Sequence, residues 1–199
     1  MNFTGAKVKK SRALGVALTP KAERIMKKRP NPPGQAGGQR RRRKSDYGVQ
    51  LLEKQRLRFQ YNVGEKYLQR MFERASRMPG ATGENLVGLL ESRMDSIVLR
   101  SGFAPTIYAA RQYVTHGHFL VNGQKATIPS QRLRPGDVIS VKPRSQSLSM
   151  FSEFRDQGSS VPYVEAELGA NTARFLYVPE RQEVPVKCEE HLVVEYYSR

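Results

Sequence analysis

The histidines are the first residues to consider for chemistry, because this sequence of 199 residues contains only three of them. His116 and His118 flank Gly117, and as metal ligands they would need further donors that the neighbouring sequence lacks. We interpret both as surface residues at a junction between a helix and a strand. His191 lies among apolar residues, which predicts a structural role. With no Ser, His and Asp in triad order and no phosphate-binding glycine loop, we expect neither an enzyme nor a cofactor.

Positive charge is the second candidate for chemistry, and it is unevenly distributed. Residues 1–46 contain 14 Lys and Arg against two acidic residues, which is +12 of the net charge of +16. Residues 47–144 contain 15 basic and 7 acidic residues, whereas residues 145–199 contain 5 basic and 9 acidic ones. Because like charges repel in a compact chain, this concentration indicates a polyanionic partner.

Three groups of basic residues could bind such a partner. A run of charge is often a solvated tail, but here the first group lies between turn residues and a capped helix, and its arginines suit bidentate phosphate contacts. Three basic surfaces on one small chain favour structured RNA over a membrane or duplex DNA. The groups are Arg40–Lys44, the stripe Lys66, Arg70, Arg74 and Arg77, and the set Arg93, Arg100, Arg111, Lys125, Arg132 and Arg134.

Helical periodicity predicts the elements that position the first two groups. The second group lies on the most regular helix, which pairs its basic stripe with an apolar face of Tyr67, Leu68, Met71, Phe72, Ala75 and Met78. Thr19 is expected to cap the first helix and Asp46 the second. The predicted helices are Pro20–Lys28, Asp46–Tyr61, Gly64–Met78, Thr82–Ser101 and Thr106–His116, the last with Tyr108 facing outward.

Strand signals follow from residue 118 onward. Asn122-Gly123 between apolar flanks predicts a hairpin, and Arg134–Asp137 predicts a turn into the strand Val138–Val141. Two more strands are expected at Tyr163–Leu168 and Ala173–Val178, whereas residues 189–197 fit either a helix or a strand. We therefore predict an α+β protein, with a helical domain packed on a mixed sheet and helix domain.

The amino-acid composition limits which kinds of protein this chain can be. Hydrophobic residues make up 38% of the chain, which is below the average for globular proteins. The shortage of hydrophobic residues lies mainly in the basic first 46 residues, which we expect to be only partly ordered or to become ordered when a partner binds. Cys188 is the only cysteine, which excludes an intrachain disulfide and a cysteine zinc site. No apolar run has the length of a membrane span, and the start lacks the apolar stretch of a secretory signal, so we expect no membrane partner.

Short motifs occur in a characteristic order along the chain. They are Pro32–Gln35, Ser45–Leu51, Glu53–Gln55, Glu65-Lys66, Thr82–Leu86, Leu90–Asp95, Ala110–Gln112, His116–His118, Val121–Gly123, Ile128–Ser130, Arg134–Val141 and Glu190–Arg199. Together they resemble the family of bacterial small-subunit ribosomal protein four over nearly the full length. Residues 91–144 resemble the small RNA-binding module named after that family.

The resemblance implies an organisation and a set of partners. It implies a basic extension over 1–45, a helical domain over 46–90 on which 188–199 folds back, the RNA-binding module over 91–144, and the remainder of the second domain over 145–187. It also implies a cytoplasmic location in the ribosome and early binding to the body, or 5′ domain, of 16S ribosomal RNA. Small-subunit proteins five and three and messenger RNA (mRNA) would lie nearby, with effects on decoding accuracy. Many relatives bind zinc through four N-terminal cysteines that this chain lacks, so no metal is expected.

Two alternative functions remain. One is an RNA-modifying enzyme or accessory subunit with the same module, for which no catalytic domain is visible, and the other is a free RNA binder of the heat-shock type.

Together, the charge pattern and the resemblance give a set of predicted RNA-binding residues. The set is Lys7, Lys9, Lys10, Arg12, Gln35, Arg40, Arg41, Arg42, Arg43, Lys44, Tyr47, Lys54, Arg56, Arg58, Lys66, Arg70, Arg74, Arg77, Arg93, Arg111, His116, His118, Asn122, Lys125, Arg132 and Arg134.

Overall fold

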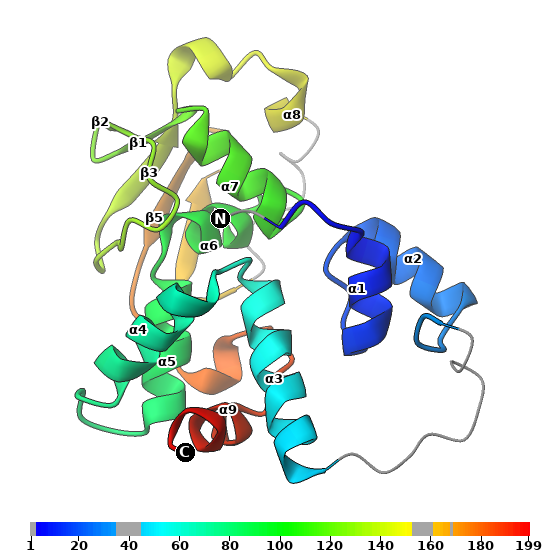
Figure 1. The fold of residues 1–199 in the computed structure, drawn as a ribbon. Coiled ribbons are helices and arrows are strands. Elements are labelled where there is room, and N and C mark those ends of the chain that lie inside the picture. The colour runs from blue at the N-terminus through cyan, green and yellow to red at the C-terminus, as the bar shows by residue number, and fades with distance from the viewer. Residues whose placement is uncertain (1–2, 35–44, 153–160, 168) are drawn as a thin grey trace. The chain divides into compact units, whose positions relative to one another are not determined.

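The computed structural model of the chain (Figure 1) describes residues 3–34, 45–152, 161–167 and 169–199. Among the predicted binding residues, Gln35 and Arg40–Lys44 lie outside this described part. The chain divides into two compact units, of which the first contains Met1–Asn85 with Val186–Arg199 and the second contains Leu86–Pro185. The first unit is helical and the second combines helices with an antiparallel sheet, which confirms the predicted α+β class.

The first unit is built around helix α3, which packs against α9 and α1. The C-terminal residues form a helix rather than a strand, and α9 buries Val193 completely. Ser45, and not the predicted Asp46, caps α3, because the Ser45 hydroxyl accepts a hydrogen bond from the Gly48 amide at 3.3 Å. The helices of this unit are α1 Lys7–Leu14, α2 Pro20–Lys28, α3 Asp46–Gln60, α4 Glu65–Ala75, the start of α5 Thr82–Glu91, and α9 Glu190–Tyr197.

Helix α1 is an element that the sequence pattern does not predict. Gly15 ends it in the left-handed region with φ 71°, and the Ser11 hydroxyl accepts a hydrogen bond from the Leu18 amide. Leu14, Val16 and Leu18 are buried immediately after or at the end of this helix. Tertiary burial of these apolar side chains therefore stabilises a helix in which half of the residues are basic.

The second unit contains a five-stranded antiparallel sheet in the order β2-β1-β3-β5-β4. Its core joins side chains of helices α6 and α7 to the inward-facing side chains of the strands, including Ile97, Val114, Phe119, Ile139 and Phe175. The elements are α6 Met94–Arg100, α7 Ile107–Thr115, β1 Phe119–Val121, β2 Gln124–Ala126, β3 Val138–Val141, η2 Pro143–Ser145, α8 Ser149–Ser152, β4 Val164–Glu167, β5 Thr172–Phe175 and η3 Arg181–Glu183.

The hairpin between β1 and β2 has the predicted turn. Asn122 and Gly123 both have positive φ, 49° and 79°, as a type I′ turn requires. The Asn122 side chain also ties this turn to the next one, because its amide donates to Asp137 Oδ1 at 2.9 Å and its carbonyl accepts from the Val138 amide at 3.0 Å. The predicted RNA contact of Asn122 thus competes with a structural role.

The prediction of one helix over Thr82–Ser101 is wrong, because the structure has two helices there, α5 and α6, with a helix break between them. Arg93 is extended and forms an isolated antiparallel bridge with Arg132. The Leu133 amide donates to the Ser92 carbonyl at 2.8 Å, and the Met94 amide donates to the Gln131 carbonyl at 2.9 Å. A segment forty residues away therefore takes the backbone hydrogen bonds that would have continued the helix.

Tyr108 corrects a second local prediction. It was expected to face outward on α7, but it is buried, and this burial raises the pKa of its hydroxyl to about 12. Ile107 beside it is also buried, so two adjacent residues in the first turn of α7 are shielded from solvent.

Candidate nucleic-acid interface

The basic stripe of the first unit lies on α4 and on the turn after it, because α4 ends at Ala75 rather than at the predicted Met78 and Arg77 follows that end. Lys66, Arg70, Arg74 and Arg77 are all exposed, and in the described part of the chain none of them forms an ion pair with a carboxylate. The three that lie on α4, Lys66, Arg70 and Arg74, fall within about one quarter of the helical circumference. Four cations on one exposed surface form the clearest candidate site for a phosphate backbone.

Packing of the opposite face holds this stripe in place. Leu68 and Ala75 are completely buried, and the Phe72 ring stacks on Tyr197 of α9 with centroids 5.0 Å apart. On the exposed side the Arg70 guanidinium lies 6.0 Å from the Tyr67 ring centroid. Helix α4 therefore has an apolar face and a cationic face, as predicted, but Met78, predicted on the apolar face, is 39% exposed and lies beyond the end of the helix.

The basic residues of α1 divide into exposed and anchored ones. Lys9 is exposed, whereas Lys10 is half-buried with its ammonium 4.4 Å above the Phe59 ring centroid. Lys7 is half-buried. The Arg12 guanidinium donates to the Asn31 carbonyl through Nε at 3.0 Å and Nη2 at 2.7 Å. Arg12 thus holds the segment after α2, which limits the RNA contact predicted for it.

Tyr47 lies in the first turn of α3, directly after the predicted run Arg40–Lys44. Its side chain is 49% exposed and lies against Tyr196 with ring centroids 5.8 Å apart. The Arg199 guanidinium lies 5.8 Å from the same Tyr47 ring. This end of the first unit therefore presents aromatic and cationic groups together.

Lys54 is not accessible as predicted, because its side chain is only 4% exposed and its ammonium binds Glu65 at 2.9 Å. Arg58 also faces Glu65, at 3.7 Å, and donates to the Val63 carbonyl at 3.2 Å. Burial opposes ionisation of Glu65, but hydrogen bonds from Lys54 and Tyr197 and the charges of Lys54 and Arg58 together lower its pKa. Two of the predicted RNA contacts on α3 thus stabilise the helical unit instead.

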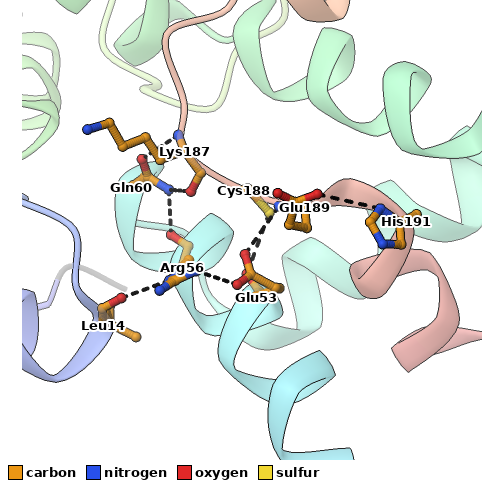
Figure 2. A network of polar contacts seen from close by, with 8 residues as sticks. All are labelled: Leu14, Glu53, Arg56, Gln60, Lys187, Cys188, Glu189 and His191. Carbon is orange, nitrogen blue, oxygen red and sulfur yellow. Dashed lines mark hydrogen bonds and ion pairs between the residues drawn. The ribbon is translucent and has the colours of Figure 1, made fainter. Parts of the chain in front are cut away.

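Arg56 is likewise used inside the first unit, as Figure 2 shows. Its guanidinium donates to the Leu14 carbonyl at 2.7 Å and forms an ion pair with Glu53. Glu53 is buried and also accepts from the Glu189 amide at 3.2 Å. Arg56 therefore connects α1 to α3, while its carboxylate partner connects α3 to the segment before α9.

The same network fixes the chain before α9. The Gln60 side chain donates to the Lys187 carbonyl at 2.9 Å and accepts from the Lys187 amide at 3.1 Å, which imitates a strand pair (Figure 2). Cys188 Sγ lies 3.6 Å from the Glu53 carbonyl oxygen.

The prediction that His191 is a structural residue among apolar side chains is wrong. His191 is exposed, and its Nδ1 lies 3.7 Å from a carboxylate oxygen of Glu189.

In the second unit Arg93 is buried rather than presented to a ligand. Its side chain is 1% exposed, and Nε and Nη2 donate to the two Asp95 oxygens at 2.9 and 2.6 Å. Arg111 lies at the margin of this pair, with Nη1 3.4 Å from Asp95 Oδ2 and its side chain 20% exposed. Only Arg111 of this predicted pair therefore reaches the surface.

Arg100, the remaining arginine of α6, is also paired internally. Its guanidinium binds both oxygens of the fully buried Glu91, at 3.0 and 2.6 Å, and the Tyr163 hydroxyl donates to the same carboxylate at 3.0 Å. Arg132, Arg134 and Lys125 are exposed. The basic surface of the second unit thus lies on its turns and β2 rather than on α6.

Gly117 is the centre of a further basic cluster. A Cβ atom at Gly117, whose φ is 74°, would lie 3.2 Å from Lys125 Cε and 3.9 Å from Lys142 Nζ. The rings of His116 and His118 flank this glycine with centroids 6.0 Å apart. Lys142 was not predicted as a binding residue, although its place directly after β3, which pairs with β1, is a signal that could have found it.

Other kinds of site find no support in the described residues. No group of three or more His, Cys, Asp and Glu side chains there could hold a metal ion. Within the same residues no helix is both long and apolar enough to cross a membrane.

Comparison with known proteins identifies the family. Residues 2–91 match the family described as Ribosomal protein S4/S9 N-terminal domain, and residues 92–139 match the S4 domain. The Small ribosomal subunit protein uS4 of Streptomyces avermitilis is 52% identical over an alignment of 203 positions, and this alignment covers 100% of this chain and 99% of that protein. The protein of the same name from Brevibacillus brevis is 47% identical over 198 residues, covering 99% and 98%. This chain therefore belongs to the uS4 family of small ribosomal subunit proteins, which carry an RNA-binding S4 domain and are not enzymes.

Proposed function

We propose that this chain is a primary binder of 16S ribosomal RNA that helps to nucleate assembly of the body of the small subunit. The observation that carries the proposal is the α4 stripe, whose four cations stay exposed while neighbouring basic residues are paired internally. A folded polyanion is the partner that such a surface requires. The exposed basic residues of the second unit support a second contact region on the same RNA.

The proposed contacts with other proteins involve the acidic C-terminal part of the chain. Residues 145–199 carry more acidic than basic residues, and Glu165, Glu167 and Glu180 are exposed there. Such a surface repels RNA and suits basic neighbours, which supports contacts with small-subunit proteins five and three. A place beside the path by which mRNA enters the subunit, with an influence on translational accuracy, belongs to the same proposal.

Salt dependence tests the RNA-binding part of this proposal. Binding to an RNA fragment of the 16S 5′ domain should weaken steeply with salt, because each neutralised phosphate releases counterions. Changing Arg40, Arg41, Arg42, Arg43 and Lys44 to Gln should reduce the slope of log K against log salt by about 4, at roughly 0.7–0.9 for each phosphate contact. Filter binding or fluorescence anisotropy between low and moderate salt measures this slope.

Helix α2 offers a matched control for the five substitutions. Its region also contains five exposed basic residues that are not among the predicted binding residues: Lys21, Arg24, Lys27, Lys28 and Arg29. Changing these five to Gln lowers the net charge equally and should change the slope much less. Equal slopes for the two variants would mean that only total charge matters, and an unchanged slope in the first variant would make the run a free tail.

A further inference from the structure

The cluster around Gly117 joins side chains from three separate segments of the second unit. His116 and His118 follow α7, Lys125 lies on β2, and Lys142 follows β3. Pairing of β1 with β3 brings the last of these close, because the Lys142 amide donates to the His118 carbonyl at 2.9 Å. Glycine is favoured at position 117 because its φ of 74° is left-handed, and a Cβ there would also lie close to Lys125 Cε at 3.2 Å and Thr127 Cγ2 at 3.3 Å. Two lysines and two imidazoles therefore gather at one place.

His118 is held in this cluster by a contact that tolerates either protonation state. Its Nδ1 lies 2.9 Å from the Ser145 hydroxyl, which can donate to a neutral nitrogen and accept from a protonated one. Within the described residues, Nε2 of His118 has no hydrogen-bond partner. Tyr113 and Phe151 pack against the edges of the ring, with centroids at 6.4 and 5.9 Å. The ring is thus fixed in position while one nitrogen is left for a ligand.

The surroundings of His118 disfavour its protonated form in the free protein. Burial, and then the neighbouring His116 and Lys142, lower the pKa of its imidazole below 6.5. The groups that face it from the other packed elements, Ser145 of η2 and Phe151 of α8, carry no charge that would reverse this. An anion placed among these groups would remove the repulsion and favour the imidazolium form.

We propose that His118, Lys125 and Lys142 bind a phosphate group of the ribosomal RNA backbone, and that His118 takes up one proton from solvent when the phosphate binds. The proposal rests on the proposed function and adds a regulation to it, because RNA affinity then depends on pH. The lysines supply fixed charge, and the Nε2–H of His118 donates to a phosphate oxygen in either protonation state. Uptake of the proton adds a third positive charge only when the anion is present.

The dissociation constant for the 16S 5′ domain fragment, measured at constant salt from pH 8 to pH 6, tests this. If binding raises the His118 pKa by about one unit, the complex should be several-fold tighter at pH 6 than at pH 8, because the full factor of about ten is reached only below both pKa values. His118→Asn keeps a nitrogen or oxygen beside Ser145 but cannot titrate, and it should remove most of this pH dependence. His191→Asn removes an exposed histidine of the first unit and should leave it intact.

A second variant gives a readout that a purely structural role would not change. Lys142→Gln should weaken binding and also reduce its pH dependence, because the His118 pKa in the free protein then starts higher. The NMR titration of His118 in the unaltered chain, alone and with RNA, reports the same shift without a substitution. A parallel titration with inorganic phosphate distinguishes the source: a shift with phosphate but not with RNA would assign the cluster to a free anion and overturn the proposal.

The remaining outcomes separate this inference from the proposed function. RNA binding that is equally tight at pH 6 and pH 8, with an unshifted His118, would overturn the proton-linked site while leaving RNA binding established. Loss of RNA binding at every pH in the unaltered chain would overturn the proposed function, and this inference with it.

Discussion

Changing both Arg70 and Arg74 of α4 to Glu is expected to weaken RNA binding by about a hundredfold or more. Hydrogen bonds to charged groups contribute roughly 1.5–3 kcal/mol each, and the new carboxylates also repel the phosphates. Both side chains are exposed, and neither forms an ion pair within the described residues. The loss should therefore come from the interface, and the melting temperature should fall only slightly, since exposed substitutions of this kind change stability by about 0.5–1 kcal/mol.

A charge-conserving pair at the same positions provides the control. Arg70→Lys with Arg74→Lys keeps both charges and loses only the planar guanidinium, so it should retain most of the affinity and show the same salt slope. Anisotropy with the 16S 5′ domain fragment measures affinity, and circular dichroism measures melting. A Glu variant that binds within twofold of the unaltered chain would remove α4 from the interface, and one that unfolds at 25 °C would show that the stripe is structural.

Local sequence signals predicted the elements whose ends depend on neighbouring residues alone. Asn122-Gly123 specified its turn, Thr19 caps α2 with its hydroxyl accepting from the Ala22 amide at 3.2 Å, and β3 begins and ends at the predicted residues. Helix α1 and the break at Ser92-Arg93 could not be predicted in this way. The first depends on burial against α3, and the second depends on backbone hydrogen bonds from residues 131–133.

The residues of the candidate interface also divide into those that local sequence predicts and those that depend on tertiary contacts. The α4 stripe follows from helical period, because an exposed face opposite an apolar face can be read from spacing alone. Whether a single basic residue reaches a ligand depends on which carboxylate the fold brings beside it. Lys54 meets Glu65 from the next helix, and Arg56 meets the Leu14 carbonyl from α1. Composition gave the total positive charge correctly, but tertiary contacts decide how much of it remains for RNA.

Asp95→Asn is expected to destabilise the second unit by about 3–5 kcal/mol, because it removes the negative charge that faces the buried guanidinium of Arg93. The Asp95 carboxylate is completely buried and accepts from Arg93, from Arg111 and from the Ser96 amide. For a unit of this size such a loss lowers the melting temperature by more than about 10 °C. Hydrogen exchange should show the amides of α6 and α7 losing protection, while those of α4 keep it.

Removing both charges should cost much less than removing one. Burial is the largest influence on the Asp95 carboxyl and raises its pKa, whereas the charges of Arg93 and Arg111 act in the opposite direction. Arg93→Met with Asp95→Leu replaces the pair by apolar side chains of similar volume, an exchange that is often neutral or stabilising for buried ion pairs. Urea unfolding of the single and double variants measures the coupling. If the double variant is as unstable as Asp95→Asn, the break between α5 and α6 needs the ion pair itself rather than the space it fills.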